Sequence, residues 1–104
     1  MVKACLDTGH FESVGKDIYG AIKLLGDHLS TMHVHDSVTW QDRHTVPFQG
    51  LIDWDGFFRG LKEIGYKGVM SFETRISERT PQPMREEMEQ TLADLARYFA
   101  DKIE

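Results

Sequence analysis

Short apolar segments alternate with amphipathic segments along this chain, and that order constrains its fold more than any other feature. Strands that alternate with helices of this length pair in parallel through right-handed crossovers. The sequence therefore predicts an α/β fold with a parallel sheet, built as one domain over residues 1–104. The expected strands cover 2–6, 29–36 and 69–73, and the expected helices cover 17–25, 53–64 and 84–103.

The helices carry recognisable boundaries and apolar faces. Gly26 is suited to end the first helix, and Asp53 is a good N-cap for the second. Polar loops are expected after Asp7, over 37–51 and over 74–83. The last helix has a continuous apolar stripe that we expect to be core. The stripe consists of Met84, Met88, Leu92, Leu95, Ala96, Phe99 and Ile103.

Composition narrows the possible functions. Twelve basic and 17 acidic residues give a net charge of -5, which disfavours binding to a phosphate backbone. No apolar run approaches the roughly 18 residues that a membrane span requires. Cys5 stands alone, so no intrachain disulfide can form, and we expect it to be a small buried packing residue. These features, with no signal peptide at the start, indicate a cytoplasmic protein without a membrane partner.

Polar side chains stand at the ends of the three expected strands. Functional groups of parallel βα arrays collect at the carboxyl ends of the strands, and side chains alternate between the two faces. The less apolar faces end in Asp7, in His33 or His35, and in Glu73. Two carboxylates and an imidazole suit a divalent cation such as Mn²⁺, Zn²⁺, Co²⁺ or Mg²⁺.

Further polar residues lie close to these strand ends in the sequence. His10 follows Asp7 by three residues, and Asp42 and His44 lie in the loop after the second strand. His10, Asp42 and His44 could hold a second metal ion, or His44 could orient a substrate hydroxyl. Arg75 lies just past Glu73, where it could contact a substrate phosphate.

Four segments together resemble the xylose isomerase-like TIM-barrel superfamily, and within it the sugar phosphate isomerase/epimerase family. They occur in the order of that family and cover nearly the whole chain. The segments are Cys-Leu-Asp-Thr-Gly-His (5–10), His-Val-His-Asp (33–36), 42–54, which begins Asp-Arg-His-Thr-Val-Pro-Phe-Gln-Gly, and 63–73, which ends Val-Met-Ser-Phe-Glu.

The resemblance implies roles for individual residues. Asp7, His33 and Glu73 match three of the four metal ligands of the family, and Glu73 also matches one of its two acid–base glutamates. His33 is preferred to His35 because the family ligand begins a His-x-x-acid segment, which here ends in Asp36. His10 matches a residue that contacts the substrate.

The resemblance also implies that the barrel is partial. A complete barrel of this type has eight strands and about 250 residues, whereas this chain resembles only its last three βα units. The fourth ligand, a glutamate, and half of the pocket are missing, so whether the isolated chain is an enzyme stays open. We expect it to form a homo-oligomer or to need a complementing N-terminal half-barrel.

Three functions are compatible with these features. The first is isomerisation or epimerisation of a sugar or sugar phosphate, by metal-assisted proton transfer next to a carbonyl. The second is cleavage of abasic DNA, because endonuclease IV belongs to the same superfamily and its Asp-Thr-x-His and Asp-Arg-His segments serve a zinc site. The third is an inactive barrel fragment that oligomerises.

Overall fold

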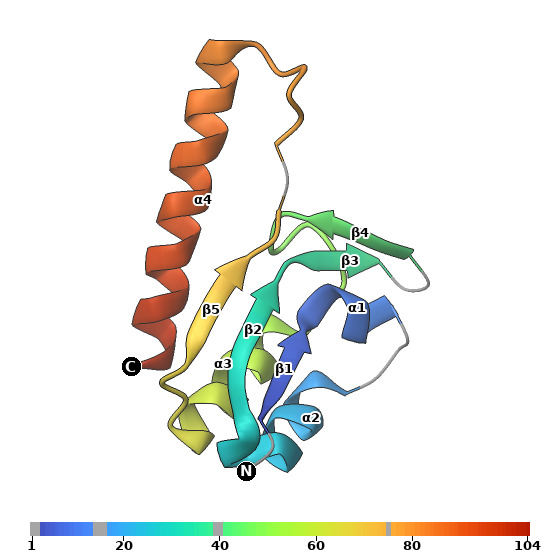
Figure 1. The fold of residues 1–104 in the computed structure, drawn as a ribbon, viewed down its shortest axis with the longest axis vertical. Helices are drawn as coiled ribbons and strands as arrows, with labels where there is room; N and C mark the ends of the chain where they lie inside the picture. The colour runs from blue at the N-terminus through green and yellow to red at the C-terminus, as the bar shows by residue number, and fades with distance from the viewer. Residues whose placement is uncertain (1–2, 14–16, 39–40, 75) are drawn as a thin grey trace.

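The computed structural model describes residues 3–13, 17–38, 41–74 and 76–104, and Figure 1 shows their arrangement. The three predicted strands form a parallel sheet and are separated by helices, which confirms the α/β class. Among the described residues, none of the helices has the length and apolarity needed to cross a bilayer. The elements are β1 (Ala4–Asp7), α1 (Thr8–Ser13), α2 (Ile18–Leu25), the 3-10 helix η1 (Gly26–His28), β2 (Leu29–Val34), β3 (Asp36–Val38), β4 (Gln41–Thr45), α3 (Trp54–Ile64), β5 (Val69–Phe72) and α4 (Gln82–Ile103).

The main sheet is parallel and has the order β1-β2-β5. Its register places Asp7 opposite His33, and His33 opposite Ser71. The backbone N–H of Glu73 donates to the carbonyl of Val34 at 2.9 Å, which continues the pairing beyond β5. The carboxyl ends of the three strands therefore lie at one edge, as in a partial TIM barrel.

The two faces of this sheet differ in burial. Leu6, Met32 and Val34 point into a core that also contains side chains from α2, α3 and α4. On the other face Cys5 and Val69 are exposed, and Val69 keeps 61% of its surface accessible. The prediction that Cys5 is buried was therefore wrong, because no helix among the described residues covers that face.

Helix α3 has the boundaries that its sequence predicts. The carboxylate of Asp53 accepts a hydrogen bond from the backbone N–H of Gly56 at 2.9 Å, so Asp53 is the N-cap. Gly65 ends the helix in the left-handed conformation that glycine adopts without steric cost. Inside these limits Trp54, Phe57 and Phe58 meet Phe99 of α4 in edge-to-face and tilted contacts.

Helix α4 follows its predicted stripe only in part. Phe99 is fully buried, and Leu95 and Ile103 pack partly against the core. Met84 and Met88, at the start of the helix, keep 53% and 47% of their surfaces exposed. The expectation of a continuous core stripe was therefore wrong for the first half of the helix, which extends beyond the sheet (Figure 1).

Two regions predicted as loops contain regular structure. Helix α1 follows Asp7 directly, and β3 pairs with β4 in an antiparallel ribbon. The ribbon starts at Asp36, a fully buried carboxylate. Its oxygens accept four N–H groups at 2.8–3.2 Å, which ties the following segment to the end of β2. The donors are the backbone nitrogens of Ser37, Phe48 and Ile52 and the indole nitrogen of Trp54.

Candidate metal centre

The three residues predicted at the strand ends converge in the structure. Ligand atoms of Asp7, His33 and Glu73 all lie within 4.8 Å of one another. Nδ1 of His33 is 3.2 Å from Oε1 of Glu73, and the side chains are 31–43% exposed. The register brings them together, because Asp7 and His33 are direct neighbours and Glu73 lies two residues beyond Ser71 on the same side.

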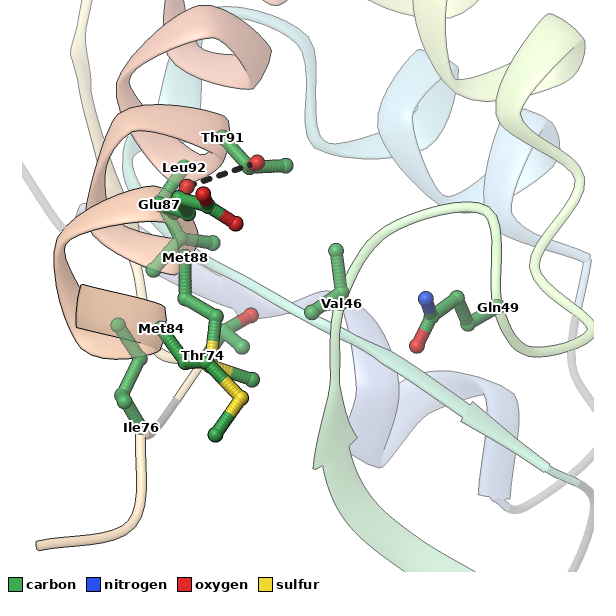
Figure 2. A pocket seen from close by; sticks show the side chains of 9 residues that line it. All are labelled: Val46, Gln49, Thr74, Ile76, Met84, Glu87, Met88, Thr91 and Leu92. Atoms are coloured by element: carbon green, nitrogen blue, oxygen red, sulfur yellow. Dashed lines mark hydrogen bonds between the residues drawn. The ribbon is translucent and has the colours of Figure 1, made fainter. Parts of the chain in front are cut away.

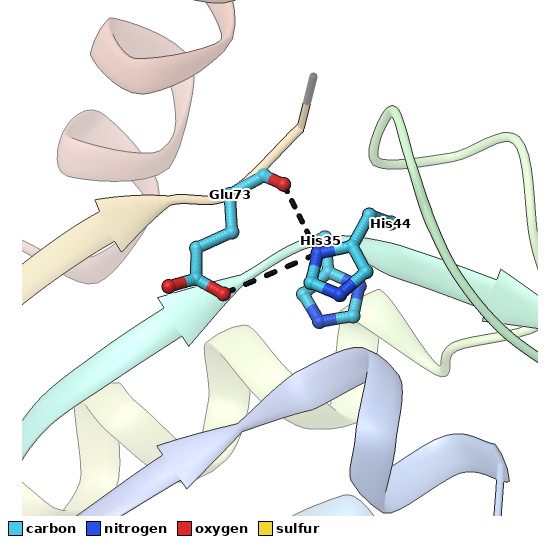
Figure 3. A group of neighbouring side chains, drawn as sticks. All are labelled: His35, His44 and Glu73. Atoms are coloured by element: carbon cyan, nitrogen blue, oxygen red, sulfur yellow. Dashed lines mark hydrogen bonds and ion pairs between the residues drawn. The ribbon is translucent and has the colours of Figure 1, made fainter.

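A second group of potential ligands shares Glu73. Figure 3 shows that it combines this residue with His35 and His44, again within 4.8 Å. Nδ1 of His44 lies 3.1 Å from the backbone carbonyl oxygen of Glu73 and 4.0 Å from its Oε2. His44 has a positive φ of 49°, so its backbone takes a conformation that few non-glycine residues adopt.

The geometry of His35 fits a metal ligand poorly. Its Nε2 lies 2.7 Å from Oδ1 of Asp7, and its Nδ1 lies 3.2 Å from the carbonyl oxygen of Asp36. Its ring also stacks on His44, with centroids 4.0 Å apart and an angle of 9° between the planes. An imidazole binds a metal in its own plane, so two stacked parallel rings cannot both direct a lone pair at one ion. The group Asp7, His33 and Glu73 fits a divalent ion better.

The remaining predicted residues are placed as follows. The backbone N–H of His10 donates to Oδ1 of Asp7 at 2.8 Å, and its side chain is exposed. Among the described residues, His10 belongs to neither group of potential ligands. The side chain of Asp42 and the whole of Arg75 lie outside the described residues, so the proposed second-metal set of His10, Asp42 and His44 stays a prediction.

The candidate centre opens into a hollow of about 280 Å³, lined by His44, Phe72, Glu73 and Thr74. Thr74 also lines a neighbouring hollow of about 390 Å³ between the start of α4 and the segment after β4 (Figure 2). That second hollow is mostly apolar, with Val46 and Met88 among its lining residues. A polar site thus adjoins an apolar surface.

Sequence reasoning missed two buried polar residues beside the centre. The resemblance favours His33 over His35 as the ligand, and it uses Asp36 only as the acid of the His-x-x-acid segment. Both are fully buried. For Asp36 a signal was present in the alternation of β2, because a polar residue that shares a face with buried Met32 and Val34 needs a partner in the interior. His35 shares the other face with Thr31 and His33, which are only partly buried, so alternation carries no such signal for it.

Comparisons with known proteins agree with this arrangement. The family model described as xylose isomerase-like TIM barrel matches residues 1–96. Relatives include an inosose isomerase of Bacillus subtilis, 35% identical over 65% of this chain and 27% of its own, and a D-psicose 3-epimerase of Ruminiclostridium cellulolyticum, 35% identical over 69% and 23%. An uncharacterized protein y4fM of Sinorhizobium fredii is 33% identical over 70% of this chain and 24% of its own.

The matched segment spans about a quarter of the length of each of these relatives. The family match, in contrast, extends over most of the present chain, and it includes all three converging residues. The parallel sheet and its polar carboxyl edge agree with that match. The chain therefore belongs to the xylose isomerase-like TIM barrel family.

Proposed function

We propose that this chain carries most of the metal site of a sugar or sugar phosphate isomerase or epimerase. The observation that supports the proposal is the convergence of Asp7, His33 and Glu73 within 4.8 Å at the carboxyl edge of the sheet. The names of two relatives, an inosose isomerase and a D-psicose 3-epimerase, support the reaction class. The proposed ion is Mn²⁺, Zn²⁺, Co²⁺ or Mg²⁺, and the proposed location is the cytoplasm.

In this proposal each residue has a defined task. A bound divalent ion supplies Lewis-acid polarisation of the substrate oxygens. Asp7 and His33 hold the ion, and Glu73 both holds it and moves a proton at the carbon next to the carbonyl. His10 and His44 contact substrate hydroxyls, and Arg75 contacts a substrate phosphate.

The experiment that tests this function removes one carboxylate. Glu73→Gln should weaken Mn²⁺ or Co²⁺ binding, measured by calorimetry, by at least about tenfold, because the amide keeps the shape but loses the charge. Glu89→Gln, an exposed glutamate of α4, is the matched control and should bind the metal like the original chain. Equal binding by the Glu73→Gln variant would reject the assignment.

We further propose that the 104 residues form one structural unit equivalent to the last three βα units of the barrel, and that the unit works in an assembly. Parallel sheets are normally covered on both faces, whereas Cys5 and Val69 lie on an open face here. Strands β1 and β5 are edges of the described sheet. The occupant of that face is either a second copy or a complementing N-terminal half-barrel.

Size-exclusion chromatography with light scattering tests the assembly directly. We expect a mass above that of one chain, or a rise in mass when the N-terminal part of a related barrel is added. The proposal would be contradicted if the chain has the mass of a monomer at high concentration and that mass does not rise when the N-terminal part is added. Ketose epimerisation is then assayed on whichever assembly forms, and an assembly that binds metal without turnover would support an inactive fragment.

Cleavage of abasic DNA is the second candidate function. It is favoured by the position of His44, which lies beside Glu73 and follows Asp42 in an Asp-Arg-His segment. Incubation with a duplex that contains one abasic site separates the two functions. Chelator-sensitive cleavage would promote the nuclease, whereas the net charge of -5 leads us to expect none.

A further inference from the structure

His35 is a fully buried imidazole in the centre of the polar edge. Its Nε2 lies 2.7 Å from Oδ1 of Asp7. An ionised carboxylate only accepts hydrogen bonds, so Nε2 carries the proton and donates it to Asp7. The side chain therefore acts on a proposed metal ligand from inside the protein, on the side opposite to solvent.

The segment after Asp7 is shaped to hold this imidazole. The hydroxyl of Thr8 accepts a hydrogen bond from the backbone N–H of His35 at 3.0 Å and donates to its carbonyl at 2.7 Å. A Cβ at Gly9 would collide with the ring of His35, so glycine provides the space that the ring occupies. Three consecutive residues, Asp7, Thr8 and Gly9, thus fit around one histidine.

The ring of His35 also contacts His44, a second residue at the candidate centre. His35 stacks on His44 at 4.0 Å, and Nδ1 of His44 lies 3.1 Å from the carbonyl oxygen of Glu73. Contacts through His35 therefore extend from the end of β1, through β4, to the end of β5. A side chain in this place fixes the relative positions of groups that the sheet alone brings only into proximity.

We propose that His35 is a positioning residue for the metal ligand Asp7, an inference that rests on the proposed metal site. Oδ1 of Asp7 accepts the Nε2–H of His35 and the backbone N–H of His10. Two donors on one oxygen restrict the rotation of the carboxylate and would so hold it in place at the candidate metal site. Hydrogen bonds of this kind to ligating carboxylates orient the ligand and raise metal affinity.

Two substitutions separate positioning from packing. His35→Gln places an amide N–H close to the position of Nε2, whereas His35→Leu has a similar volume and no donor. Mn²⁺ affinity of the full chain is measured by calorimetry, with circular dichroism as the check on folding. We expect His35→Gln to bind within about threefold of the original chain and His35→Leu to bind about 10–100-fold more weakly.

The outcomes distinguish this inference from the proposed function. If the original chain binds no Mn²⁺, the proposed metal site is rejected, and the positioning role of His35 is rejected with it. Mn²⁺ binding that is equal in the original chain and in folded His35→Leu would reject positioning alone. Comparable losses in His35→Gln and His35→Leu would also overturn it, because a donor at that position would then not suffice.

A spectroscopic measurement covers the case in which His35→Leu fails to fold. The ring nitrogens of His35 are observed by ¹⁵N NMR in the original chain during titration with Zn²⁺, which is diamagnetic. We expect Nε2 to stay protonated at saturation, since it donates to Asp7 throughout. Loss of that proton on metal binding would show that His35 is itself a ligand and would overturn the proposal.

Discussion

Helices α3 and α4 both carry apolar residues at helical spacing, yet they bury different shares of them. In α3 the buried side chains include Trp54, Phe57, Phe58 and Leu61, from its first turn to its last. In α4, all of which lies in the described part of the chain, Phe99 alone is buried. The spacing of apolar residues therefore identifies a face of a helix, but the rest of the fold determines whether that face is covered.

The two helices differ in burial because their first turns have different contacts. Trp54, the first residue of α3, donates its indole N–H to the buried carboxylate of Asp36 at 2.8 Å. The start of α4 instead borders the apolar hollow of about 390 Å³, where Met84 and Met88 are half exposed (Figure 2). One helix is anchored at its beginning, whereas the other is anchored near its end.

The largest expected effect comes from the one buried residue of α4. Phe99→Ala removes a side chain that contacts five aromatic rings, three in α3, one in β5 and that of Phe48. It should cost about 3–5 kcal/mol of unfolding free energy. Met88→Ala, on the same stripe, should change stability by about 0.5 kcal/mol or less. Urea denaturation measures both. An equal loss in Met88→Ala would mean that the first half of α4 is covered in solution.

The anchor of α3 should give the next largest effect. Each oxygen of Asp36 accepts two N–H groups, so Asp36→Asn can satisfy only one of the two pairs. We expect a loss of about 2–3 kcal/mol, measured by urea denaturation. Asp55→Asn, an exposed acid in the first turn of α3, is the control and should be close to neutral. Similar losses for both would mean that the charge near the helix start matters, and not the buried hydrogen bonds.

The smallest expected effect compares exposed carboxylates on the two helices. Tyr19 and Lys23 of α2 hydrogen-bond to Glu63 of α3 and lower the pKa of that carboxyl. Arg97 and Gln90, within α4 itself, lower the pKa of Asp94. Glu63→Gln removes bonds between helices, whereas Asp94→Asn removes bonds inside one helix, so the thermal midpoint at pH 7 should fall more for Glu63→Gln.

The sign of the pH dependence follows from the lowered pKa of Glu63. The stabilisation is fully present above the pKa that glutamate has in the unfolded chain, and it is lost as the pH falls through the lower folded value. The thermal midpoints of the original chain and of Glu63→Gln should therefore converge in acid. A gap that persists at pH 2 would show that the carboxylate charge is not its origin.

The positions of the polar residues at the strand ends could be predicted from the sequence, because two general rules of parallel sheets suffice for them. Alternation within each strand places Asp7, His33 and Glu73 on one face, and parallel pairing places the strand ends at one edge. The proximity of these residues follows from those rules, while their metal-binding role stays a prediction.

The neighbourhood of His35 and Asp36 could not be predicted in the same way. Their partners come from residues 7–9 and 44–54, and no local pattern specifies which distant segments supply them. The β3–β4 ribbon has the same origin, since it begins at the buried Asp36. The first half of α4 is the opposite case. Its apolar stripe is clear in the sequence, but among the described residues no element covers Met84 and Met88 fully.

The open face of the sheet also carries a chemical reporter. Cys5 is the single cysteine of the sequence, it is exposed, and it lies opposite Thr31 in the register. The rate of its alkylation will therefore measure how much of that face is occluded, without any engineered label. The same thiol can join two copies covalently when reductant is absent, so an assembly mass that falls on reduction would reflect oxidation and not barrel completion.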